Sequence, residues 1–110
     1  MKIHDKLVRD RIPEIIRDSG KIPLCETLSD EQYLDALEQK LLEEAQEYRQ
    51  IPCMEEMADL LEVIEAICRA RGFETETLQN IKKEKARKRG AFEKRIFLHA
   101  VAEKDEKIRE

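Results

Sequence analysis

The chain has 110 residues, of which 42% are charged and 5% are aromatic, and its formal net charge is -4. This composition indicates one small, helix-rich domain, and the length excludes a second independent core because so short a chain buries too little surface for two. No apolar run approaches the ~20 residues of a membrane span, and the N-terminus lacks the apolar segment of a signal peptide. Three cysteines without C-x-x-C spacing argue against disulfides and zinc. We therefore expect a cytoplasmic protein with no membrane partner, made of one domain over residues 1–101 and a charged tail over 102–110.

The first half of the chain predicts a short helix followed by a long one. Pro13 suits the first turn of a helix that ends at Gly20, and residues 23–28 alternate loosely, as a short strand does. Ser29 and Gln32 form a capping-box pattern at the start of the long helix. Its apolar stripe has spacings of three and four and comprises Leu34, Leu37, Leu41, Ala45 and Tyr48.

The second half predicts two more helices. The Ile51-Pro52 pair ends the long helix, and the next helix runs to Gly72 with a stripe of Met57, Leu60, Leu61, Ile64, Ile67 and Cys68. Thr75 is a suitable N-cap for a fourth helix that ends at Gly90. Residues 95–101 are apolar apart from Arg95 and His99 and are compatible with a strand paired with 23–28 or with a short helix. The predicted fold is mainly α: an antiparallel helical hairpin plus short flanking helices, with a small two-stranded β element as an option.

Acidic side chains gather in the two arms of this hairpin. The first arm carries Glu43, Glu44 and Glu47 as E-E-x-x-E, and the second carries Glu56 and Asp59 as E-x-x-D. At ~100° per residue these acids flank the apolar stripe of each helix. If the chain folds back between Ile51 and Pro52, Glu47 faces Glu56 and Glu44 faces Asp59. Four carboxylates should then meet in one layer.

Such a charge run is commonly a solvated acidic face. The acids lack cationic partners in the sequence pattern, apart from Lys40 four residues before Glu44, and like charges at i,i+4 destabilise a helix by about 0.2–0.5 kcal/mol. A divalent cation would neutralise them, and an all-oxygen ligand set suits Mg²⁺ or Mn²⁺. A di-iron site would need Glu-x-x-His pairs, whereas His4 and His99 do not follow a Glu at that spacing.

Basic residues are concentrated in the fourth helix and just after it, and residues 82–95 contain eight cations and two acids. The chain has no Gly-rich phosphate loop, so side chains would have to hold a phosphate group. Asn80, Lys83 and Arg87 lie on one face of this helix and are our candidates. A nucleic-acid surface is the alternative, but five aromatic residues supply little base stacking and the acidic half would repel a long polyanion.

The motifs together resemble a known family. E-E-x-x-E followed by E-x-x-D is similar to the signature of the MazG-like all-α nucleoside triphosphate pyrophosphohydrolases. Residues 6–16 (K-L-V-R-D-R-I-P-E-I-I) and 89–96 (R-G-A-F-E-K-R-I) resemble its small phosphoribosyl-ATP pyrophosphohydrolase-like branch. The resemblance spans residues 3–98. One departure is the interval between Glu47 and Glu56, which is shorter than is common in that superfamily.

The resemblance implies an acid-anhydride hydrolase that uses Mg²⁺ to split a nucleoside triphosphate into a monophosphate and pyrophosphate. It implies metal binding by Glu44, Glu47, Glu56 and Asp59, with Glu43 as an outer ligand or base for the attacking water. Asn80 and Lys83 resemble the family's N-x-x-K phosphate contact, and a homo-oligomer is implied. Two roles stay open for Lys6, Arg9 and Arg11: contact with the substrate, or ion pairs that anchor the N-terminus. The alternatives are hydrolysis of phosphoribosyl-ATP in histidine biosynthesis, a non-catalytic nucleotide or metal sensor, and a helical interaction module without a ligand.

Overall fold

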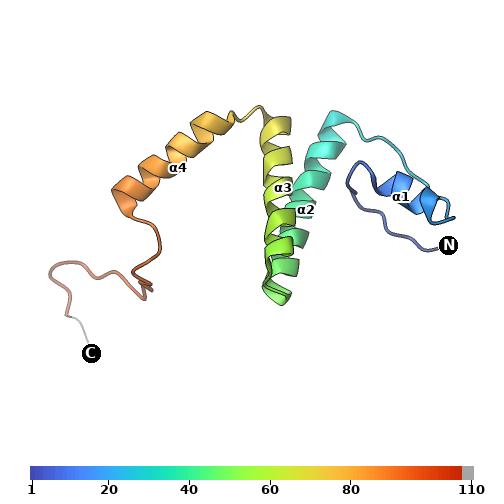
Figure 1. Cartoon of the computed structure of the whole chain (residues 1–110). Coiled ribbons are helices and arrows are strands. Elements are labelled where there is room, and N and C mark those ends of the chain that lie inside the picture. The colour runs from blue at the N-terminus through green and yellow to red at the C-terminus, as the bar shows by residue number, and fades with distance from the viewer. Residues whose placement is uncertain (108–110) are drawn as a thin grey trace. The chain divides into compact units, whose positions relative to one another are not determined.

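The computed structural model describes residues 1–107, and within that range all regular structure is helical (Figure 1). The helices are α1 (Ile12–Asp18), α2 (Asp30–Gln50), α3 (Met54–Arg71) and α4 (Thr75–Arg89). The mainly α prediction is therefore confirmed. The chain divides into two compact units, Met1–Thr75 with α1 to α3, and the part from Glu76 onward with nearly all of α4. None of the described helices combines the length and the apolar character needed to cross a bilayer.

The helix ends lie where local sequence signals predict them. The Ser29 hydroxyl accepts a hydrogen bond from the Gln32 backbone N–H at 3.3 Å, and the Gln32 side-chain oxygen accepts one from the Ser29 N–H at 3.2 Å. This capping box satisfies two backbone donors that the first turn of α2 would otherwise leave unpaired. At the C-terminus of the hairpin, Gly72 ends α3 with a φ of 71°, a left-handed conformation that glycine adopts without a Cβ clash.

Helices α2 and α3 pack against each other as the predicted antiparallel hairpin. Leu37 on α2 and Val63 on α3 are its buried apolar residues, and Arg71 at the end of α3 pairs with Glu38 of α2. The half-buried apolar residues around this pair are Leu34, Leu41, Tyr48, Leu60, Ile67 and Cys68.

Both predicted apolar stripes, on α2 and on α3, are wrong in part. Ala45 is exposed, and so are Met57, Leu61 and Ile64, whereas Val63 lies in the buried row although the stripe omitted it. The apolar residues of α3 span an arc wider than one neighbouring helix can cover, so the position of α2 selects which of them are buried.

The optional β element does not form among the described residues. Residues 23–28 and 95–101 are both irregular. A two-stranded ribbon needs one face buried against other elements. Leu24 is instead 76% exposed, and Phe97 is 80% exposed. Of the predicted tail, residues 102–107 are exposed and without regular structure, and 108–110 lie outside the described residues.

Candidate functional site

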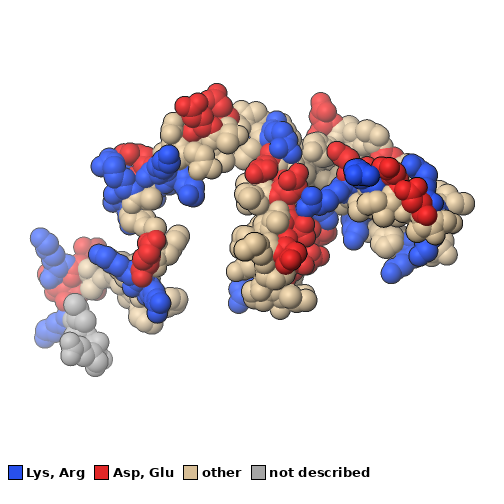
Figure 2. Space-filling view, viewed as in Figure 1, with Lys and Arg blue, Asp and Glu red and all other residues tan. Residues whose placement is uncertain are grey.

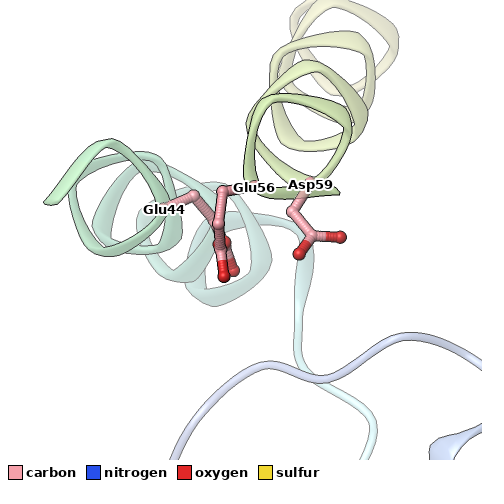
Figure 3. Close-up of side chains that lie close together, drawn as sticks. All are labelled: Glu44, Glu56 and Asp59. Carbon is pink, nitrogen blue, oxygen red and sulfur yellow. The ribbon is translucent and has the colours of Figure 1, made fainter. Parts of the chain in front are cut away.

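Three carboxylates converge on one side of the hairpin. Glu44 of α2 and Glu56 and Asp59 of α3 each contribute one carboxylate oxygen, and these three oxygens lie within 4.8 Å of one another (Figure 3). Glu56 and Asp59 share a face because they are three residues apart on a helix. The antiparallel arrangement brings Glu44 to the same level as Glu56 and Asp59. The predicted register also placed Glu47 in this layer, but Glu47 is not among the three converging carboxylates.

The cluster contains carboxylate oxygens that are removed from water and lack donors. Glu44 is only 6% exposed. Its Oε2, like Oε2 of Glu56, is buried and has no hydrogen-bond partner in the part of the chain that the structure describes. A buried acceptor left unpaired costs about 1–3 kcal/mol, and more if it is charged. The hairpin therefore holds at least two oxygens in an environment where a cation would stabilise them.

The electrostatic environment agrees with this geometry. Burial is the main cause that raises the pKa of Glu44, and the neighbouring carboxyl of Glu47 raises it further while Lys40 lowers it. Burial also leads the causes that raise the pKa of Glu56, followed by Glu47 and Asp59. Glu47 thus interacts with Glu44 and Glu56 although its own side chain is exposed. The acidic cluster is hereafter Glu44, Glu47, Glu56 and Asp59.

Two cations of residues 1–107 contact the acidic cluster. The Lys40 ammonium lies 3.5 Å from Glu44 Oε1 and 3.9 Å from Glu43 Oε2. The Arg9 guanidinium donates a hydrogen bond from Nη2 to Asp59 Oδ1 at 2.7 Å. The prediction that Asp59 has no cationic partner was therefore wrong. Helix periodicity could not reveal this pair because its members are 50 positions apart, and the only signal was the basic K-L-V-R-D opening.

An all-oxygen ligand set of this kind fits a small divalent cation. Mg²⁺ takes oxygen ligands at about 2.1 Å, so two oxygens on one ion are at most about 4 Å apart. The oxygens of Glu44, Glu56 and Asp59 lie within 4.8 Å of one another, which is slightly more than this distance, and a small inward movement of the side chains would bring them close enough. Four carboxylates face two cations, so the acidic cluster keeps an excess of negative charge. Along the α2–α3 hairpin, Figure 2 shows acidic atoms gathered beside a smaller number of basic ones.

The predicted phosphate-binding residues lie on α4, in the second unit. Asn80, Lys83 and Arg87 are all exposed. Arg87 donates hydrogen bonds to both carboxylate oxygens of Glu84, at 3.0 Å from Nε and 2.6 Å from Nη2. This fork lowers the pKa of Glu84 and raises that of Arg87. Arg87 is thus engaged within its own helix, and the phosphate role of the three residues stays a prediction.

Comparison with known proteins identifies a short region of similarity. An uncharacterized protein of Mycolicibacterium smegmatis (strain ATCC 700084 / mc(2)155) is 59% identical over 44 residues. The matched region is 40% of this chain and 45% of that protein, so the chain spans less than half the length of this relative. No family model matches the chain, and no solved structure matches it.

Proposed function

We propose that this protein is a Mg²⁺-dependent nucleotide pyrophosphohydrolase, with Mn²⁺ as an alternative ion. The observation that carries the proposal is the meeting of Glu44, Glu56 and Asp59, with oxygens of Glu44 and Glu56 buried and unpaired. The resemblance of both acidic motifs and of the K-L-V-R-D opening to MazG-like enzymes supports it. The reaction is the hydrolysis of the anhydride between the α- and β-phosphates, with nucleoside monophosphate and pyrophosphate as products.

Glu44, Glu47, Glu56 and Asp59 would hold the metal. When bound, Mg²⁺ would neutralise phosphate charge and increase the acidity of a coordinated water. Burial of Glu44 in the hairpin orients its carboxylate and keeps solvent away from it. Its position between Lys40 and the acids of α3 fixes one oxygen on the ammonium and leaves the other facing the cluster.

Glu43 is the candidate for accepting the proton of the attacking water. Its side chain is 51% exposed, and its contact with Lys40 is long at 3.9 Å, so it can reach solvent at the edge of the acidic cluster. Asn80, Lys83 and Arg87 are proposed to bind the polyphosphate. For Arg87 this requires exchange of Glu84 for a phosphate group, which the guanidinium fork also binds in two-point fashion.

A homo-oligomer, either a dimer or a tetramer, is part of the proposal. The hairpin leaves several large apolar side chains at least one third exposed, namely Leu42, Met54, Met57, Leu61 and Ile64. Met54, Met57, Leu61 and Ile64 recur every three or four residues along α3 and therefore share one helix face, and an exposed apolar face is typical of an interaction site. Sedimentation equilibrium of the whole chain should give a mass of two or four protomers, and a monomer at micromolar concentration would contradict it.

The deciding experiment is a substrate screen with Mg²⁺, scored by the release of pyrophosphate. Its substrates are the nucleoside triphosphates, their oxidised forms and phosphoribosyl-ATP. Glu56→Gln should abolish turnover, whereas Glu62→Gln, the same change at an exposed position of α3, should preserve it. Preferential cleavage of phosphoribosyl-ATP would assign the histidine-pathway reaction. Binding without turnover would indicate a sensor, and release of orthophosphate would overturn the proposed bond.

A further inference from the structure

The N-terminal segment brings a cation to the acidic cluster from outside the hairpin. Residues 1–6 are exposed, but Leu7 and Val8 are half-buried, and the next residue is Arg9. Its Nη2 donates to Asp59 Oδ1 at 2.7 Å across 50 positions of sequence. In Figure 3 the N-terminal segment passes on the side of the hairpin toward which the three carboxylates point. The contact therefore joins the segment to the candidate site itself.

Within residues 1–107, Arg9 uses only a small part of its hydrogen-bonding capacity. A guanidinium has five N–H donors in a planar fork, and the contact with Asp59 occupies one nitrogen. The Arg9 side chain is 57% exposed and that of Asp59 is 41% exposed, so the pair lies at the solvent edge of the cluster. An exposed ion pair contributes only about 0–1 kcal/mol to folding, which makes a purely structural purpose a weak account of it.

Two electrostatic effects of opposite sign follow from this position. A fixed positive charge beside Asp59 repels a divalent ion that approaches the same carboxylates, and this repulsion weakens binding of the ion alone. The same charge attracts a polyphosphate, and its remaining donors match phosphate oxygens. Removal of Arg9 should therefore favour the ion and disfavour the anionic substrate.

We propose that Arg9 is the resident counter-ion of the acidic cluster, and that it binds phosphate oxygens of the substrate when a divalent ion joins the carboxylates. This inference rests on the proposed function and assigns to that site a phosphate-binding residue from the N-terminal segment. Arg9 and the acidic cluster belong to the same unit, Met1–Thr75, so this unit would itself supply a cation that binds the substrate.

Two binding titrations on the full chain test this assignment, one with Mn²⁺ alone and one with α,β-methylene-ATP at saturating Mg²⁺. Arg9→Gln should bind Mn²⁺ about three- to tenfold more tightly and the nucleotide analogue about tenfold more weakly. Arg9→Lys keeps the charge and loses the fork, so its Mn²⁺ affinity should stay near the wild-type value. Arg11→Gln is the matched control, because Arg11 pairs with Glu14 of α1, and both affinities should change less than twofold.

The outcomes separate the roles that Arg9 could have. Weaker Mn²⁺ binding by Arg9→Gln would mean that the arginine only positions Asp59, and it would overturn the assignment. An Arg9→Gln variant that binds the nucleotide analogue as tightly as the wild type would also overturn the assignment. A wild-type protein that binds no Mn²⁺, with or without nucleotide, would refute the proposed function and this inference with it. Thermal melts followed by circular dichroism confirm that each variant is folded.

Discussion

Replacement of Glu44 by glutamine should stabilise the metal-free protein while it removes the proposed activity. Glu44 is 6% exposed, and its Oε2 is buried without a hydrogen-bond partner. Glutamine has nearly the same shape, removes one negative charge from a group of repelling carboxylates, and carries an amide that can donate to Glu47 or Glu56. Glu44 is thus predicted to make the metal-free protein less stable than glutamine would, because it keeps a charged oxygen at the site.

The size of the effect follows from the contacts of this side chain. An unpaired buried acceptor costs about 1–3 kcal/mol. Glutamine would lose the charge of the 3.5 Å contact with Lys40, but its side-chain oxygen can still accept from the ammonium, and Glu43 stays a partner of Lys40 at 3.9 Å. We therefore expect this loss to be about 1 kcal/mol. The net gain in the free energy of unfolding should be about 1 kcal/mol, equivalent to a rise in Tm of about 4–8 °C for a domain of this size.

The pH dependence supplies a second check on the same variant. Burial and Glu47 raise the pKa of Glu44 in the folded protein. Below the ordinary glutamate pKa of about 4.3, the carboxyl is neutral in both the folded and the unfolded state, so wild-type stability is fully present there. As the pH rises through the folded-state pKa that stability is lost. The advantage of Glu44→Gln should therefore be present at pH 7.5 and vanish near pH 4.

Urea denaturation in EDTA, followed by circular dichroism at both pH values, measures this difference. Glu62→Gln makes the same change of charge at an exposed position of α3 and should shift the unfolding free energy by less than about 0.5 kcal/mol. Destabilisation of Glu44→Gln at pH 7.5, or an equal gain at both pH values, would refute the reasoning.

Three further predictions concern the metal, the pH and the basic helix. Mg²⁺ or Mn²⁺ should raise the Tm of the wild-type protein because it binds only the folded state, and Glu56→Gln should reduce that shift in differential scanning fluorimetry; an equal shift in the variant would contradict the site. Because the pKa values of Glu44 and Glu56 are raised, these two groups should lower the unfolding free energy of the metal-free protein from pH 4 toward pH 7, so the Glu44→Gln Glu56→Gln double variant should gain stability over the wild type as the pH rises; urea titrations that give both proteins the same pH dependence would contradict this. Lys83→Ala should lower kcat/KM by about 10- to 150-fold with little change in Tm, while Lys82→Ala and Lys85→Ala stay near the wild-type value; equal losses of nucleic-acid affinity in all three variants, with hydrolysis unchanged, would assign the helix to nucleic-acid binding.

Local sequence signals were sufficient for the helix boundaries and for the level at which the acids meet. The Ser29 capping box and the left-handed Gly72 depend on residues within one turn, so a sequence window contains the whole interaction. The short Ile51-Pro52 connection forces the two arms to be antiparallel neighbours, and this places Glu44 beside Glu56 and Asp59. Strand-like alternation in residues 23–28 was a weaker guide because a strand also needs a partner and a buried face.

The sequence by itself determined that the chain is helical, where its long helices begin and end, and that acids from both arms of the hairpin converge. Only the tertiary structure decided that Val63 is buried while Leu61 and Ile64 stay exposed, because periodicity defines a face of a helix and the neighbouring helix covers only part of it. The structure likewise decided that Arg9 contacts Asp59. A contact between residues far apart in the chain depends on how the N-terminal segment packs, and that packing leaves no periodic pattern in the sequence.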